Sequence, residues 1–225
     1  MSLEQQAIQR EQSRFNMIEQ QIRTWDVLNV AVLDLLTKLP REDFVPKQYK
    51  GLAFADIEIP LGHGQLMLSP KIEGRILQAL EIKKTDKVLE VGTGSGYLTA
   101  LMALQGKQVD SIELNSKISA QAAKNIAAQG IVNVTLSVAD GIQGNAAGAP
   151  YDVIVYTGAL PLAPSQQVER QLAIGGRMFV VVGDEPVMEA TLVTRISSDE
   201  FKREVLFETC LPVLENALQP DRFAF

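Results

Sequence analysis

A chain of 225 residues, 46% of them hydrophobic, is long enough to bury a substantial core, and one large domain is expected. The net charge of −6 and the lack of a long basic cluster argue against a protein that binds nucleic acid or anionic membranes. The first six residues do not have the charged-then-apolar layout of a signal peptide, and no apolar run approaches the ~18 residues of a membrane span. We therefore expect a soluble, cytoplasmic protein.

The chain has one cysteine, Cys210, and one histidine, His63. This excludes an intramolecular disulfide and a Cys/His metal cluster, so no metal site is expected. Cys210 stands among apolar sequence neighbours, which predicts a buried, inert thiol rather than a nucleophile. A Ser-His-Asp triad would have to use His63.

Residues 1–39 form a predicted helical extension. Residues 3–23 favour a polar helix with a thin apolar stripe at helical spacing, made of Ile8, Phe15, Ile18 and Ile22. A second helix is expected near residues 30–38 and ends before Pro40. A helix as polar as the first packs on the outside of a domain or against another subunit, so an oligomer through this helix is one expectation.

Residues 40–86 are expected to form a substrate-side loop and helix. Two glycines close to Pro60, at positions 62 and 64, predict an irregular loop with special backbone angles around residues 61–65. Ser69 and Pro70 then begin a helix well, as N-cap and first-turn residue. Because this helix leads directly into the next strand, its N-terminal end and the preceding loop are expected to cover a ligand.

The rest of the chain is organised around residues 87–98. Val88, Leu89 and Val91 predict a strand buried on both faces, and a glycine turn and a helix follow it. The third glycine comes two residues after the second, which differs from the G-x-G-x-x-G pattern of dinucleotide-binding proteins. With its acid in the strand, the run resembles the first motif of S-adenosylmethionine (SAM) dependent methyltransferases. The residues of that motif are Glu90, Gly92, Thr93, Gly94, Ser95 and Gly96.

Acids close the next two predicted strands as well. Residues 109–112 lead into Glu113 and Leu114, where nucleotide-binding α/β units place a ribose-binding acid. Residues 134–138 lead to Asp140 and Gly141, where the same methyltransferase class holds the adenine edge. The plainer interpretation is a tight turn with ordinary helix-capping acids, but three acids closing three successive strands favour a SAM site.

The remaining pattern alternates strands and helices and then ends in strands. A helix capped by Asn115 is followed by a strand at 151–156, a helix at 165–173 and a strand at 177–182. Residues 189–196 and 201–209 both alternate and predict an antiparallel hairpin. The predicted fold is therefore an α/β, Rossmann-like SAM-dependent methyltransferase with a mixed, doubly wound sheet. Helices are expected on both faces, and residues 87–225 carry the sheet within a single domain spanning 1–225.

From about residue 40 to residue 212, the sequence resembles the protein-L-isoaspartate O-methyltransferase family. The more specific matches are Pro-Arg-Glu-Asp-Phe-Val-Pro at 40–46 and Ile-Pro-Leu-Gly-His-Gly-Gln at 59–65, because many SAM enzymes share the glycine motif at 88–97. The extra N-terminal helix and residues 214–225 fall outside this resemblance.

The resemblance implies methyl transfer from SAM to the carboxylate of an isoaspartyl residue in an age-damaged protein or peptide. Such chemistry suits a sequence without His or Cys machinery, since the sulfonium carries the activation and a carboxylate is a nucleophile at pH 7. The protein needs to hold the two reactants in line and exclude water.

One departure from the family affects the acceptor side. Where the family carries Thr-Ile-Ser, this chain has Leu66, Met67 and Leu68, and a serine follows one position later as Ser69. Ser69 is either a substitute hydroxyl or a plain N-cap, Gln65 either donates to a carboxylate or braces the loop, and His63 is a catalyst or a structural residue. Two alternatives follow: the same fold acting on a different acceptor, or a non-catalytic SAM-binding module.

Overall fold

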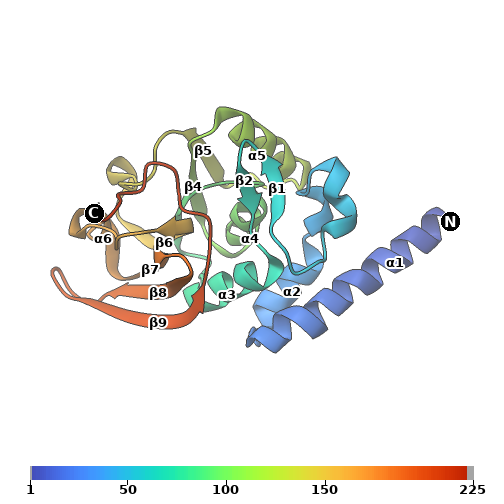
Figure 1. Cartoon of the computed structure of the whole chain (residues 1–225), viewed down its shortest axis with the longest axis horizontal. Coiled ribbons are helices and arrows are strands. Elements are labelled where there is room, and N and C mark those ends of the chain that lie inside the picture. The colour runs from blue at the N-terminus through green and yellow to red at the C-terminus, as the bar shows by residue number, and fades with distance from the viewer. Residues whose placement is uncertain (1, 222–225) are drawn as a thin grey trace, which may run out of the picture.

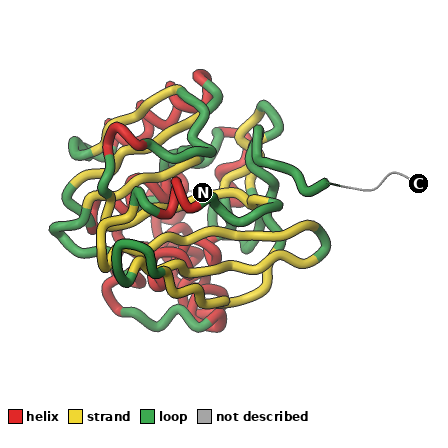
Figure 2. The backbone as a smooth tube through the Cα atoms, turned by 90° about the vertical axis from the view of Figure 1, so that its left-hand side faces the viewer, coloured by secondary structure: helices red, strands yellow, loops and turns green. Residues whose placement is uncertain are grey.

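The computed structural model describes residues 2–221 and has a seven-stranded sheet at its centre, drawn in Figure 1. The strand order is β5-β4-β3-β6-β7-β8-β9. Strands β5, β4, β3, β6 and β7 run parallel, whereas β8 is antiparallel to β7 and β9 is antiparallel to β8. The strands are β3 (Lys87–Val91), β4 (Gln108–Glu113), β5 (Val134–Val138), β6 (Tyr151–Leu160), β7 (Leu172–Asp184), β8 (Val187–Arg195) and β9 (Phe201–Thr209). In Figure 2 the strands, in yellow, lie side by side as one twisted layer. The predicted fold class and the C-terminal hairpin are confirmed.

The two faces of the sheet are covered differently. Val88 and Val153 face a large core shared with α3 (Pro70–Leu80), α4 (Tyr97–Gln105) and α5 (Ser116–Ala128). Leu89 and Ile154 face a smaller core that α6 (Gln166–Glu169) and residues near the C-terminus cover. Successive residues of a strand point to opposite faces, which explains the division.

The predicted helix at 165–173 is wrong in length. α6 spans Gln166–Glu169, and Leu172 already pairs with Tyr151 as the first residue of β7. Gly175 and Gly176, expected to end a helix, lie inside that strand, where Gly175 adopts a φ of +81°. The strong parallel pairing with β6 therefore overrides the local helix signal.

The N-terminal segment is helical, as predicted, but it is not one regular helix. α1 (Leu3–Asn16) continues into a π-helix (Met17–Ile22) and a 3₁₀ turn (Arg23–Trp25), and α2 (Val30–Lys38) follows. Ile18 and Ile22 are buried, whereas Ile8 and Phe15 are 61% and 58% exposed. The predicted apolar stripe therefore packs only in its second half, and α1 projects away from the sheet in Figure 1.

Residues 59–67 form a small hairpin rather than the predicted loop. β1 (Ile59–Gly62) and β2 (Gln65–Met67) pair antiparallel, with Ile59 opposite Met67 and Pro60 opposite Leu66. The expected special backbone angles are present, since Gly62, His63 and Gly64 have φ values of +88°, +54° and +77°. This tight turn is what allows the glycine-rich segment to pair with itself.

A buried arginine holds the hairpin against α3. Arg41, in the 3₁₀ turn Arg41–Asp43, forms an ion pair with Glu73 and donates to the carbonyl oxygens of Ala53 and Leu68 at 2.9 and 2.6 Å. Both charged side chains are almost fully buried. The segment at 40–46, with a second 3₁₀ turn at Lys47–Leu52 after it, thus positions the backbone at Leu68.

Cys210 is exposed, so the prediction of a buried thiol is wrong. It follows the end of β9, and its Sγ lies 3.8 Å from Glu185 Oε1. Its apolar sequence neighbours do not bury it, because neighbouring residues of extended chain point in opposite directions.

None of the helices among residues 2–221 combines the length and apolarity that crossing a membrane requires. Over the same residues, no group of three or more His, Cys, Asp or Glu side chains is arranged to hold a metal ion.

Candidate active site

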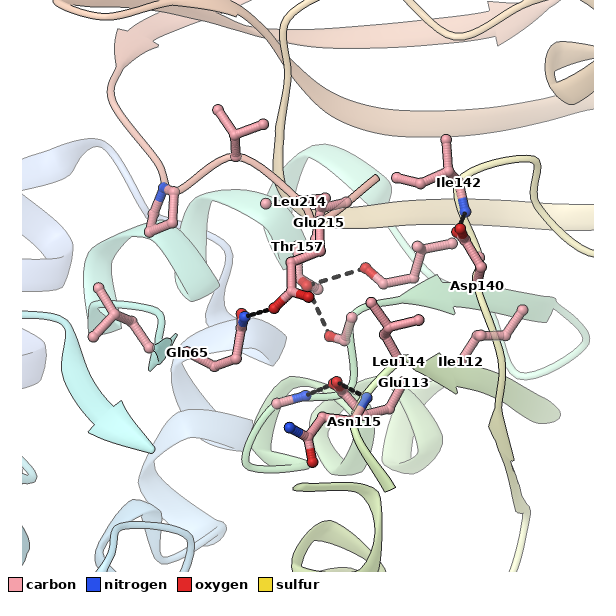
Figure 3. A pocket seen from close by; sticks show the side chains of 18 of the residues that line it. Gln65, Ile112, Glu113, Leu114, Asn115, Asp140, Ile142, Thr157, Leu214 and Glu215 are labelled. Atoms are coloured by element: carbon pink, nitrogen blue, oxygen red, sulfur yellow. Dashed lines mark hydrogen bonds between the residues drawn. The ribbon is translucent and has the colours of Figure 1, made fainter. Parts of the chain in front are cut away.

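A cavity opens at the carboxyl ends of β3, β4 and β6, close to where the chain order of the sheet reverses. From β3, one crossover leads outward to β4 on one side, while β6 lies on the other. Ligands of open α/β sheets bind at this kind of switch point. The lining comes from the hairpin segment 58–68, the glycine turn, the ends of β4, β5 and β6, and residues 212–215, as Figure 3 shows.

The glycine turn presents bare backbone to this cavity. Gly92 has a φ of +96°, and a Cβ at this position would lie 2.2 Å from Thr157 Oγ1. Thr157 Oγ1 donates to the carbonyl oxygen of Gly92 at 2.7 Å, which ties β6 to the turn. A residue with a side chain is therefore excluded at position 92 by backbone strain and by contact.

The turn's other polar residues have structural partners. Thr93 Oγ1 lies 2.6 Å from Ser111 Oγ, and Ser95 Oγ accepts from the Tyr97 amide at 3.2 Å. Gly96, with a φ of +81°, is the N-cap of α4. Thr93 and Ser95 line a small cavity. It adjoins the cavity at the strand ends, which we call the main cavity of this site, so both residues shape the turn beside it.

Glu113 connects the turn to the start of α5. Its Oε2 accepts from the Gly94 amide at 3.1 Å and its Oε1 from the Asn115 amide at 3.0 Å. A carboxylate has about four acceptor positions, so both oxygens can still accept from ligand hydroxyls. Leu114, 40% exposed, lines the cavity beside it.

Asp140 is held from two sides. Its Oδ1 accepts from the Ile142 amide at 3.0 Å, and its Oδ2 accepts from Asn216 Nδ2 at 2.9 Å. Gly141 packs so closely that a Cβ would lie 2.8 Å from Val91 Cγ1. The Asp140 carboxylate is thus fixed in place at the end of the cavity that lies away from the hairpin, where it can accept a hydrogen bond from an amino group.

Glu90 is fully buried and only half satisfied. Its Oε2 accepts from Thr99 Oγ1 at 2.5 Å and from Ser111 Oγ at 2.6 Å, whereas its Oε1 has no partner among the described residues. Burial raises the pKa of this carboxyl to about 8, against the opposing effect of the two hydroxyl donors. Because buried polar atoms are normally paired, the unpartnered Oε1 atom marks a position where a ligand can form a hydrogen bond.

These residues fit SAM. An ammonium group, which SAM carries, would supply a donor to Glu90 Oε1, and Glu90 lines the small cavity next to Gly92. The main cavity contains the side chains of four acids, Glu58, Glu113, Asp140 and Glu215, and no Lys, Arg or His among its described lining residues. An acidic lining suits a ligand with a sulfonium and an ammonium group.

The three residues predicted for the acceptor side are not brought together. Gln65 lines the main cavity and donates from Nε2 to Glu215 Oε1 at 2.7 Å. His63 faces a neighbouring cavity, on the other side of the hairpin tip. Ser69 is buried at the N-cap of α3 without a side-chain capping bond, and it is not among the residues that line either cavity.

Sequence reasoning missed the contribution of the C-terminal segment. Residues 212–215 run alongside β6, where the Ala159 amide donates to Pro212 O at 2.9 Å and the Leu214 amide to Ala159 O at 3.0 Å. Glu215 and Asn216 then contact Gln65 and Asp140. Thr157 was also missed as a site residue, although its position directly after a predicted strand could have indicated it. For Glu58 and residues 214–216, no feature of the nearby sequence indicates a place in the site.

Comparison with known proteins shows the family to which this chain is related. The family model for protein-L-isoaspartate(D-aspartate) O-methyltransferase matches residues 12–215. The match includes part of the N-terminal helix, which we expected to fall outside the family. Protein-L-isoaspartate O-methyltransferase 1 of Rhodopseudomonas palustris (strain HaA2) is 39% identical over 194 residues, 86% of this chain and 79% of that protein. Protein-L-isoaspartate O-methyltransferase of Methanospirillum hungatei JF-1 is 39% identical over 85% of this chain and 88% of its own length.

Solved structures show the same fold. A protein-L-isoaspartate O-methyltransferase superposes with a TM-score of 0.78 at 25% identity, covering 93% of this chain and 67% of the other. A Plasmodium falciparum protein described as a putative protein-L-isoaspartate O-methyltransferase, solved with S-adenosyl-L-homocysteine, reaches 0.75 at 18% identity, covering 89% and 97%. The extent of these matches confirms the resemblance: the chain belongs to the protein-L-isoaspartate(D-aspartate) O-methyltransferase family.

Proposed function

We propose that the protein transfers a methyl group from SAM to the free carboxylate of isoaspartyl residues in proteins and peptides. The observation that carries this proposal is that the glycine turn, the strand-end acids and the hairpin line one shared cavity. A role in protein repair in the cytoplasm is part of the proposal; the relatives are named for protein L-isoaspartate as the methyl acceptor.

In this proposal each part of the cavity has a task toward SAM. Glu113 accepts from the ribose hydroxyls, with Leu114 beside it, and Asp140 and Gly141 hold the adenine edge. Glu90 Oε1 accepts from the ammonium group, and Gly92 to Gly96 leave room for the methionine portion. SAM supplies an activated methyl group, so the protein needs no nucleophile of its own.

The acceptor side works by positioning and by excluding water. Leu66 and Leu68 line both the main cavity and the small cavity that contains Glu90 and Gly92. Gln65 Nε2 is the side-chain donor of the hairpin that can turn from Glu215 to a substrate carboxylate. The family's hydroxyls each contribute a hydrogen bond of about 1–3 kcal/mol to a buried carboxylate, and their loss predicts weak binding of the acceptor.

The test is methylation of an isoaspartyl peptide, with the same peptide containing ordinary aspartate as its control. We expect a methyl ester on the isoaspartyl peptide, identified by its rapid loss in mild alkali, and no transfer to the control. No transfer to the isoaspartyl peptide, or a methyl group that survives alkali, would contradict the proposal.

A second candidate is a methyltransferase of the same fold that acts on a different, less charged acceptor. It is favoured by the apolar side chains of Leu66 and Leu68 in the cavity. SAM binding without turnover of the isoaspartyl peptide, together with transfer to another acceptor, would support it. Transfer to no acceptor in a broad panel would instead favour a non-catalytic SAM-binding or interaction module, for which the lost hydroxyls and the polar N-terminal helix are the arguments.

A further inference from the structure

One face of the hairpin determines what the acceptor meets in the cavity. Ile59 and Met67 are paired and point into the core, with 0% and 3% exposure. Side chains alternate along the strands, and Leu66 and Leu68 line the cavity, Leu66 with 37% exposure and Leu68 with 8%, where the cavity borders the core. Continuing the register by one residue puts Glu58 opposite Leu68, where antiparallel neighbours lie roughly 5 Å apart.

Glu58 is the charged side chain of this face, and it differs from the other acids of the cavity. Glu113 and Asp140 accept from backbone amides, and Glu215 accepts from Gln65. Glu58 lines the cavity but makes no hydrogen bond or ion pair within residues 2–221. Partial burial raises the pKa of Glu58, so a nearby cation would stabilise its ionised form.

Leu66, Leu68 and Glu58 together offer an apolar wall that ends in a carboxylate. A lysine or arginine side chain has the matching layout, because its methylene stem packs on apolar surface while its head pairs with an acid. A negatively charged residue in the same place would meet Glu58, Glu215 and no basic side chain among the described lining residues.

We propose that this hairpin face selects isoaspartyl substrates that carry a lysine or arginine next to the methylated residue, with Glu58 binding the cationic head and Leu66 and Leu68 the stem. This inference rests on the proposed function and names the substrate class of that site. The favourable pairing with the flanking cation compensates for the hydroxyl donors that the substrate carboxylate lacks here.

The test uses three isoaspartyl peptides that differ only in the residue following the isoaspartyl position, which is Lys, Gln or Glu. Their affinities are measured by calorimetry with protein saturated with S-adenosyl-L-homocysteine, so binding is read without turnover. We expect the order Lys, Gln, Glu, with the Lys peptide binding roughly tenfold more tightly than the Glu peptide at low salt, and a smaller ratio at high salt.

Variants assign the preference to a residue. Glu58→Gln should reduce the ratio between the Lys and Glu peptides to near one, and Glu58→Lys should invert it. Glu200→Gln, the same charge change in the exposed turn before β9, should leave the ratio as it is. The affinity for S-adenosyl-L-homocysteine is measured for each variant, and every peptide affinity is compared at saturating S-adenosyl-L-homocysteine, so that an effect on the cofactor is separated from one on the peptide.

Equal affinity for the three peptides would overturn the inference. So would a Glu58→Gln variant that keeps the full preference, or one that weakens only cofactor binding, because Glu58 would then serve SAM. Methylation of the same peptides tests the proposed function separately: the expected binding order without methyl-ester formation would contradict that function and still support the charge selection.

Discussion

Glu90→Gln should make the ligand-free protein more stable and the cofactor complex weaker. Glu90 is fully buried, its pKa is raised by burial to about 8 from an ordinary value of 4.5, and its Oε1 lacks a donor. When folding raises the pKa of a carboxyl, the folded protein is most stable below the unfolded pKa, where the group is protonated in both states. The free energy of unfolding then falls as the pH rises from the unfolded pKa to the folded pKa. The shift from 4.5 to about 8 corresponds to about 3 kcal/mol at pH 7 and about 5 kcal/mol above pH 9.

Glutamine keeps the shape and the acceptor for Thr99 and Ser111 but does not ionise. The free energy of unfolding of the variant should therefore equal that of the unmodified protein near pH 4.5 and exceed it increasingly between pH 5 and 8. Chemical denaturation of the ligand-free proteins at four pH values measures this difference. Groups that titrate in both proteins cancel in the comparison.

The same substitution should weaken SAM binding by about 10- to 100-fold, the value of a charged hydrogen bond of about 1.5–3 kcal/mol. S-adenosyl-L-homocysteine should lose affinity to the same extent, since it has the ammonium group and lacks the sulfonium. A stability difference that does not change with pH would refute the burial argument. Undiminished affinity for both molecules would refute the pairing of Glu90 with the ammonium group.

Three other experiments test separate parts of the cavity. Glu113→Ala should weaken SAM binding by about 1–3 kcal/mol in calorimetry, and unchanged affinity would refute the ribose assignment. Leu68→Ser should raise the rate of isoaspartyl methylation. It should also lower the free energy of unfolding by about 2–3 kcal/mol, because Leu68 is only 8% exposed. No gain in rate would mean that the missing hydroxyl is not what limits the reaction. Gly92→Ala should abolish SAM binding, and adding Thr157→Ala should restore it only in part, because the second change removes the 2.2 Å contact and leaves the φ of +96°. Full restoration by the double variant would show that backbone strain at position 92 is negligible.

The central part of the site was predictable because its signals are local. A strand, a glycine turn and a helix are consecutive in the chain, and parallel strands bring their carboxyl ends to one edge of the sheet. The acids at positions 90, 113 and 140 therefore had to converge near Gly92 once the βα units were recognised, and the structure brings all of them to the cavities beside that turn. The family follows from the same residues and from the segments at 40–46 and 59–65.

The acceptor side depended on contacts that are distant in the sequence. Gln65 meets Glu215 across 150 residues, and nothing near either position predicts that pair. The face on which Glu58 and Leu68 lie follows from the register of a hairpin that the sequence suggested to be a loop, and a shift of one residue would turn both away from the cavity. Pairing with β6 likewise decides that residues 172–176 are strand, and strand geometry leaves Cys210 exposed. The sequence alone determined the cofactor side through local spacing, and only the packing of remote segments decided what faces the acceptor.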